Sequence, residues 1–99
     1  MKHDLYTFVL DVDGGSYISQ ILDHDLHEAI LSWSDIMDGD ILKAFNVSEY
    51  TFIKESVEAA LRDPDQGPVA LANLKNIWFM YFSVNDITGY LNIIKTDNK

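Results

Sequence analysis

Apolar and polar side chains alternate in the first part of the chain. Aromatic or aliphatic residues occupy every second position from Tyr6 to Val12, and the residues between them are mostly polar or charged. A period of two in aromatic and branched residues predicts a strand with one face buried. We therefore expect the first strand here, with its even-numbered side chains in the core.

A tight turn and a second strand follow directly. Residues 13–16 have the sequence Asp-Gly-Gly-Ser, which is a strong signal for a two-residue hairpin turn. Either Asp13-Gly14 or Gly14-Gly15 fits as the central pair, and both choices keep the same side chains on the core face. The second strand is predicted at about 16–22. Its core-facing residues are Tyr17 and Ile21.

The next segment has the pattern of a helix that packs on the sheet. Asp25 stands three residues before Glu28, which is the spacing of a capping box with Asp in place of Ser or Thr. Apolar residues then recur at helical intervals, and Gly39 suits a C-terminal cap. We therefore predict a helix over residues 26–38 that packs onto the sheet through Trp33.

A second helix is predicted after a short connector. It begins at Ser48 and stops before Pro64, because a proline disfavours helical geometry in the residue that precedes it. Residues 63–68, Asp-Pro-Asp-Gln-Gly-Pro, form the one clear loop. The apolar stripe of this helix comprises Tyr50, Ile53, Val57, Ala60 and Leu61.

The last third of the chain returns to strands. Residues 77–84 are apolar at successive positions, as expected of a central strand covered on both faces. A turn at 85–89 and a strand at 90–96 follow, while 69–74 fits either a short strand or a helical turn. The predicted order is β-β-α-α-(β)-β-β, an α+β fold in which two helices pack on a mixed or antiparallel sheet of 4–5 strands.

Composition favours a single domain over residues 1–99. The length and the 47% apolar share are ordinary for one globular domain. The absence of cysteine excludes disulfides and thiolate metal sites. Together with the lack of a signal-peptide pattern, it favours a cytoplasmic location, and no apolar run is long enough to span a bilayer.

The negative charge is concentrated at the beginning of the chain. The net charge is -9, and residues 1–42 hold nine acids against one base, whereas residues 43–99 hold seven acids against six bases. Such a field repels nucleic acid and anionic membranes and attracts basic proteins. An acidic surface also aids solubility, although solubility does not require this asymmetry. We therefore expect a basic protein partner, and neither nucleic acid nor a membrane.

Two segments have the composition of metal sites without their spacing. Counted from Asp11, a calcium loop needs Gly at its sixth position and Glu at its twelfth, where the chain has Ser16 and Leu22. His24 and His27 lie three residues apart, whereas the zinc-protease motif places its histidines four apart. The sequence therefore predicts no metal and no other cofactor.

Catalytic and nucleic-acid-binding motifs are also missing from the sequence. No serine or threonine sits in a nucleophile-elbow motif, and the composition excludes cysteine nucleophiles. The aromatic tract at 78–82 has the composition of a base-stacking platform, but such platforms lie in positively charged grooves, so a core strand explains it better. We expect a protein that is not an enzyme.

Both ends of the chain carry short motifs of one kind of small protein. Residues 6–11 (Tyr-Thr-Phe-Val-Leu-Asp) and 14–20 (Gly-Gly-x-Tyr-Ile-Ser-Gln) precede a helix that opens with Glu28-Ala29, and the chain ends with 74–78 (Leu-x-Asn-x-Trp) and 91–96 (Leu-Asn-Ile-Ile-Lys-Thr). These motifs resemble those of small bacterial toxin-immunity proteins of the contact-dependent inhibition type. The hairpin and helix are also similar to the antitoxins of small messenger-RNA-cleaving toxins, but the DNA-binding segment of such antitoxins is not visible here.

The resemblance implies a cytoplasmic protein that binds and neutralises a cognate toxin, for which a nuclease is one candidate. The charge argument agrees independently, because nucleases tend to carry basic clefts for phosphate and an acidic domain can mimic that phosphate. The expected partner-binding residues are Asp11, Asp13, Asp23, Asp25, Glu28, Asp35, Asp38 and Asp40.

Two other interpretations stay open on the sequence alone. One is a structural or regulatory domain that self-associates through a sheet edge, which a stable dimer without a partner would favour. The other is a small enzyme or ligand carrier, which a closed apolar pocket between sheet and helices would favour. Neither the oligomeric state nor the strand order follows from the sequence.

Overall fold

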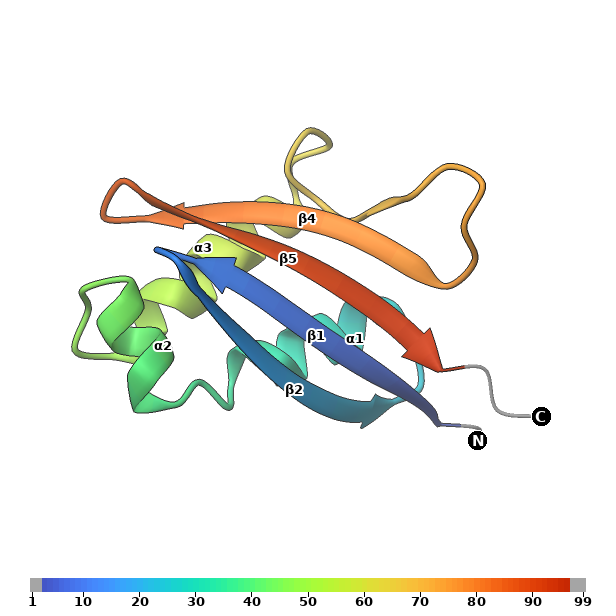
Figure 1. The fold of residues 1–99 in the computed structure, drawn as a ribbon, viewed down its shortest axis with the longest axis horizontal. Helices are drawn as coiled ribbons and strands as arrows, with labels where there is room; N and C mark the ends of the chain where they lie inside the picture. The colour runs from blue at the N-terminus through green and yellow to red at the C-terminus, as the bar shows by residue number, and fades with distance from the viewer. Residues whose placement is uncertain (1–2, 97–99) are drawn as a thin grey trace.

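The computed structural model describes residues 3–96 and contains one antiparallel sheet with helices on one side of it (Figure 1). The strand order is β2-β1-β5-β4-β3, and every neighbouring pair is antiparallel. The predicted α+β class and strand number are therefore confirmed. The elements are β1 (Asp4–Val12), β2 (Gly15–Asp23), α1 (Leu26–Ser34), α2 (Gly39–Ala44), α3 (Tyr50–Leu61), β3 (Val69–Ala70), β4 (Ile77–Val84) and β5 (Ile87–Thr96).

Two-residue turns fix the register of the two long hairpins. Val12 faces Gly15 across the first turn, so its central pair is Asp13-Gly14, with φ of 49° and 80°. The second turn has Asn85-Asp86 at its centre, with φ of 54° and 62°. Positive φ at both central positions is the geometry of a type I′ turn, whose twist matches that of the paired strands.

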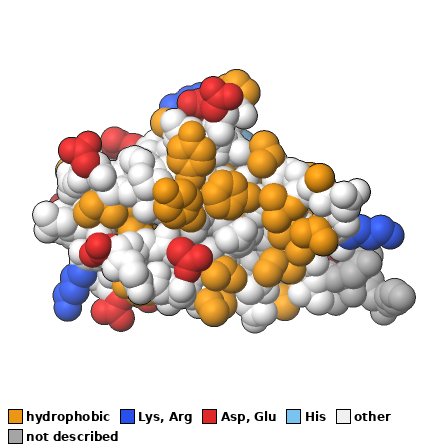
Figure 2. Space-filling model, turned by 45° about the horizontal axis from the view of Figure 1, so that its top comes forward, with side chains coloured by type: hydrophobic (Ala, Val, Ile, Leu, Met, Phe, Trp, Pro, Cys, Tyr) orange, Lys and Arg blue, Asp and Glu red, His pale blue; other side chains and the backbone are white. Residues whose placement is uncertain are grey.

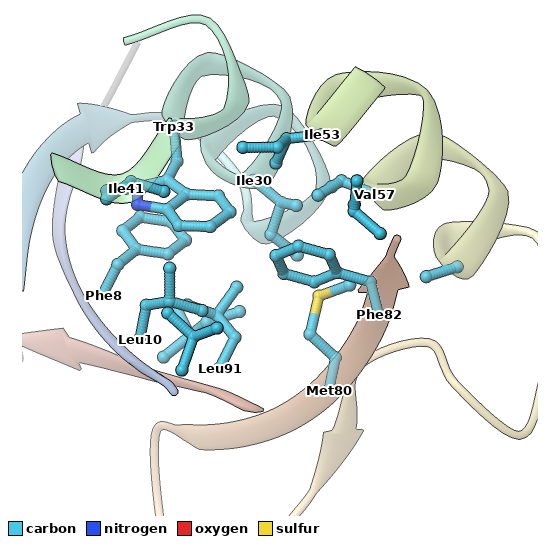
Figure 3. Close-up of a cluster of buried hydrophobic side chains, with 14 of the residues drawn as sticks. Phe8, Leu10, Ile30, Trp33, Ile41, Ile53, Val57, Met80, Phe82 and Leu91 are labelled. Carbon is cyan, nitrogen blue, oxygen red and sulfur yellow. The ribbon is translucent and has the colours of Figure 1, made fainter. Parts of the chain in front are cut away.

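The core lies between the helices and one face of the sheet. Alternate side chains of β1 point toward the helices, and Phe8 and Leu10 are completely buried. The Trp33 ring of α1 lies on Phe8, with ring centroids 5.5 Å apart, and meets the edge of Phe82 at 6.2 Å. Figure 3 shows these rings together with side chains of α3 filling the space between the layers. The predicted packing of the first helix through Trp33 is therefore confirmed.

The end of α2 is fixed to the turn between β4 and β5. Phe45 stacks on Phe82, with ring centroids 5.3 Å apart, and Asn85 Nδ2 donates to the carbonyl oxygens of Phe45 and Asn46 at 3.1 and 2.9 Å. A Cβ at Gly89 would lie 2.7 Å from the Phe45 ring. Glycine at this position therefore lets Phe45 approach the sheet.

The helical region contains three helices rather than the predicted two. The helix expected over 26–38 ends at Ser34, and Asp38 begins a new helix because its carboxylate accepts the Ile41 N–H at 3.1 Å. Gly39 is therefore in the first turn of α2, and its interpretation as a C-terminal cap is wrong. The sequence Asp38-Gly39-Asp40 suits both the end of one helix and the beginning of the next. The sequence alone therefore did not show that a new helix begins here.

The surroundings of β4 also differ from the prediction. The order of the strands places β5 at the centre of the sheet, and only the two-residue β3 lies beyond β4. Helices cover one face of β4, where Met80 and Phe82 are buried, while Phe79 and Tyr81 project half-buried from the other face. The ambiguous segment 69–74 forms β3 and then a turn.

Replacing Trp33 with alanine should destabilise the fold severely. The side chain is 2% exposed and contacts rings from β1 and β4, so its removal leaves a cavity beneath α1. We expect the free energy of unfolding, measured by urea denaturation, to fall by about 3–5 kcal/mol. Phe52→Ala is the matched control, because this ring is 53% exposed on α3 and its loss should cost about 0.5 kcal/mol or less. Equal losses in the two variants would contradict the assignment of Trp33 to the core.

Candidate functional site

One whole face of the sheet is left without a covering layer. All three helices lie on the opposite side, and within residues 3–96 no helix packs on this side (Figure 1). We call it the uncovered face. Its projecting apolar side chains, all exposed or half-buried, are Leu5, Val9, Ile18, Leu22, Val69, Ile77, Phe79, Tyr81, Tyr90 and Ile94.

The strand register joins these side chains into a continuous surface. Val9 faces Ile18 on one side and Asn92 on the other, and Asn92 in turn faces Phe79. Phe79 stacks on Tyr90 with ring centroids 6.2 Å apart. Figure 2 shows hydrophobic side chains gathered over the sheet, with acidic side chains at the borders of this patch. Contiguous apolar surface of this kind on a protein is typical of an interaction site.

Asp11 and Asp13 lie at one end of the uncovered face. Asp11 faces Tyr90 across the β1–β5 pair and accepts a hydrogen bond from Ser16 Oγ. These residues and Thr88 line an open hollow of about 320 Å³ beside the first hairpin turn. Since the Tyr90 side chain is 50% exposed, an aromatic ring and two carboxylates are accessible to the same partner.

Asp23, Asp25 and Glu28 lie at the other end of β2. Asp23 lies seven positions after Ser16 along the extended strand, which corresponds to about 23 Å. Asp25 caps α1 by accepting the Glu28 N–H at 2.7 Å. His24 lies between the two aspartates, 2.9 Å from Asp23 and 3.3 Å from Asp25. This group is therefore distant from Asp11 and Asp13, and part of its charge has a local structural role.

The electrostatic environment at this end shifts the pKa of two residues. The backbone N–H of His24, 2.8 Å from the Asp23 carboxylate, stabilises its charged form and lowers the pKa of Asp23. Burial raises the pKa of Tyr6, and the carboxylates of Asp4, Asp25 and Asp23 raise it further. The acids at the end of β2 therefore lie close enough to produce a shared negative potential.

The remaining three acids flank the junction of α1 and α2. Asp38 caps α2, and Asp40 is exposed in its first turn. Asp35 accepts a hydrogen bond from Lys54 of α3, which raises the pKa of Lys54. Asp38 lines an open hollow together with Tyr17 of β2. Asp38 therefore lies beside the first half of β2, whereas Asp35 faces α3.

The structure thus places the eight predicted partner-binding acids in three groups rather than in one. It brings Asp11, Asp13 and Asp38 to the same end of β2, on the uncovered face and at the edge of the sheet. Within residues 3–96 these three have no ion pair, in contrast to Asp35 with Lys54. Their role in binding a partner stays a prediction. Asp38 also caps α2, whereas Asp11 and Asp13 cap no helix.

Within residues 3–96 the structure assembles no metal site, and it does not bring His24 and His27 together. These residues contain no cluster of three His, Asp or Glu side chains placed to hold a metal ion. His27 lines a hollow with Glu58 of α3 and with Arg62, which follows that helix. His24 instead pairs with its neighbouring aspartates, so the two histidines have separate surroundings. None of the helices in this part of the chain has the length and apolar character of a membrane-spanning helix.

Sequence reasoning missed the uncovered face, although a signal for it was present. When strands carry apolar side chains on both faces, a packed layer is expected on each side of the sheet. The part of the chain that the structure describes has too few helical segments to supply two layers, and all of them pack on one side of the sheet. The number of apolar sheet faces exceeds what the predicted helices can cover. This comparison would have indicated that one apolar face is left for a partner.

Comparison of the chain with protein-family models, with curated protein sequences and with solved structures finds no match. The site is therefore interpreted from its own geometry and charge.

Removing the Asp23 carboxylate should change how stability depends on pH. Because the pKa of Asp23 is lowered in the folded protein, the ionised group stabilises the fold above the ordinary value of 3.8, and this contribution is lost as the pH falls through the lower folded value. Urea midpoints measured from about pH 7 to about pH 2 should fall less steeply for Asp23→Asn than for the wild type. Asp65→Asn, in an exposed loop, should keep the wild-type profile. A wild-type profile for Asp23→Asn as well would refute the assignment.

Proposed function

We propose that this protein is a non-enzymatic binding protein of the immunity type, which neutralises a basic cognate toxin by covering part of its surface. The observation that carries the proposal is the uncovered face, which presents apolar and aromatic side chains beside Asp11 and Asp13. An apolar centre with a polar rim is the usual composition of a protein interface. The motifs that resemble toxin-immunity proteins favour the same role and, with it, a cytoplasmic location.

The aromatic residues of the uncovered face are suited to be the affinity anchors. Tyr and Trp dominate the energetics of many interfaces because a large rigid ring is buried at a small cost in conformational entropy. Tyr90 is half exposed, stacks on Phe79 and faces Asp11, so it lies where the apolar patch meets the acidic end. A toxin side chain that combines apolar and cationic character, such as arginine, fits this position.

The negative charge has a different role in this proposal. Residues 3–42 contain no Lys and no Arg, and the whole chain has a net charge of -9. Such a field accelerates association with a basic partner and discriminates against acidic ones, whereas it contributes less to final affinity. The toxin is therefore expected to bind rapidly at low salt and more slowly at high salt.

A surface function is better supported than a ligand-binding one. The space between the sheet and the helices is filled by core side chains, and the hollows described above open onto solvent (Figure 3). Self-association through the uncovered face is the second candidate, because an apolar face also suits a second copy. The like charge of two chains opposes it, and the mass in solution without a partner decides between them.

The direct test is co-expression with the product of the neighbouring gene. The proposal expects the two proteins to co-purify as a stable complex and the neighbour's toxicity to be suppressed. A stable dimer of this chain that ignores the neighbour would favour self-association instead. Failure of the neighbour to bind in any ratio would refute the immunity role.

Neutralising the acidic end should weaken binding in a salt-dependent way. The double variant Asp11→Asn and Asp13→Asn keeps the hydrogen-bonding side chains and leaves an Asn-Gly pair that suits the type I′ turn. We expect about a tenfold loss of affinity at low salt, mostly through slower association, and a shallower dependence on salt. Glu49→Gln with Glu55→Gln is the control, because both are exposed in or beside α3 in the helical layer. Equal effects of the two double variants would show that only net charge matters.

Truncating the aromatic anchor should weaken binding with little dependence on salt. For Tyr90→Ala we expect a loss of about 2 kcal/mol or more in binding free energy, seen mainly as faster dissociation in surface plasmon resonance. Phe52→Ala removes an aromatic ring of similar exposure from the helical layer and should leave binding unchanged. Wild-type affinity for Tyr90→Ala would exclude the acidic end of the uncovered face from the interface.

A further inference from the structure

The outer side of β2 is a sheet edge with regularly spaced unpaired backbone groups. Val12 and Gly15 close the first turn as a hydrogen-bonded pair, so the odd-numbered residues of β2 direct their N–H and C=O groups toward β1. The even-numbered residues direct theirs outward. Across residues 3–96, no backbone–backbone hydrogen bond outside the helices and the ladder involves β2. The outward-facing residues are Ser16, Ile18, Gln20 and Leu22.

This edge lacks the devices that usually prevent strand addition. Proteins protect exposed edges with lysine, proline, a bulge, a short strand or a covering loop. β2 has nine residues in unbroken register with β1 and contains neither lysine nor proline. Its edge side chains include Ile18 and Leu22, which are 69% and 65% exposed. The edge is therefore open, long and partly apolar.

A hollow of about 250 Å³ lies directly beside this edge. It touches the consecutive residues 16–19 of β2, so it follows the strand rather than either face of the sheet. Its far wall comes from the junction of α1 and α2, where Ile36 and Met37 supply apolar surface and Asp38 supplies the one charged group of the lining. A strand added beside β2 would direct every second side chain into this hollow.

We propose that the outer edge of β2 accepts an extended segment of the basic partner as an additional strand of the sheet. The proposal rests on the proposed function and names the way in which the partner is held. Strand addition supplies affinity through main-chain hydrogen bonds and specificity through alternate side chains. In the partner segment, apolar residues lie beside Ile18 and Leu22, and a lysine or arginine enters the hollow toward Asp38.

Charge selects a basic segment over a second copy of this chain. If β2 paired with its own copy, the added strand would contain no lysine or arginine to place in the hollow that Asp38 lines. Each chain would also carry a net charge of -9 into the contact. Like charges in one interface oppose association, whereas a cationic segment is complementary to the same edge.

Residue-resolved hydrogen exchange tests the proposal directly. In the protein alone, the outward amides at 16, 18, 20 and 22 should exchange rapidly, and those at 17, 19 and 21 should be protected by β1. In the complex with the neighbouring gene's product, the outward amides should slow at least about tenfold. A complex in which these amides still exchange rapidly would overturn the strand addition and leave the immunity function intact.

A peptide probe separates failure of this inference from failure of the proposed function. The probe is a capped synthetic peptide that alternates lysine and valine, and its control alternates glutamate and valine. Selective protection of the outward amides by the lysine peptide supports the edge site even if the neighbour does not bind. No protection by either the neighbour or the lysine peptide overturns it. Protection that grows with protein concentration alone would assign the edge to a second copy and also overturn it.

Two matched variants give an independent readout in the complex. Gln20→Pro removes one outward N–H, whereas Gln20→Ala removes the same side chain and keeps that N–H. With folding of both confirmed by circular dichroism, Gln20→Pro should bind about three- to tenfold more weakly than Gln20→Ala. Equal affinities of the two Gln20 variants would overturn the proposal.

The charge of Asp38 is tested separately. Asp38→Asn keeps a good helix cap and removes the charge, so it should reduce the salt dependence of binding.

Discussion

The packing of a single helical layer on one side of the sheet, centred on Trp33, is the constraint on which the rest of the structure depends. Trp33 lies against rings from β1 and β4, which are separated in the sheet by β5, and so ties the two halves of the sheet to α1. α2 and α3 complete the same layer through residues such as Phe45 and Ile53. Because all the helices of residues 3–96 pack on this side, the other side of the sheet has no covering layer from this part of the chain.

The acidic character of the chain has two components with different consequences. Part of it maintains local structure: Asp25 and Asp38 cap helices, and Asp35 pairs with Lys54. These carboxylates would be present in a protein with no partner at all. The rest, above all Asp11 and Asp13, stands beside an exposed aromatic ring and satisfies no helix end. Charge counted along a sequence mixes the two components, and only the structure separates them.

Much of the fold could be predicted from the sequence because its signals are local. The alternation in β1, the Asp-Gly turn and the apolar spacing around Trp33 each depend on a few neighbouring residues. The boundary between α1 and α2 could not be predicted, because Asp38 serves as an N-cap in a sequence that equally suits a helix end.

The candidate site was less accessible to prediction than the fold. Whether Phe79 and Tyr90 are buried depends on how many helices pack and on which side, which is a property of the whole chain. The grouping of Asp11 with Asp38 around one end of β2 likewise required the tertiary arrangement. The resemblance to immunity proteins supplied a role for an acidic protein without locating the surface.

The position of β5 has a consequence for how the chain reaches its native state. Among the strands of residues 3–96, β5 comes last in the sequence, yet it lies at the centre of the sheet and pairs with β1, the first strand. Contacts of such long sequence separation slow folding, because a long loop must be closed before they form. Until then the first hairpin has apolar residues on both faces and no partner on its inner side. During synthesis, therefore, the first hairpin remains exposed to aggregation and proteolysis until β5 has emerged.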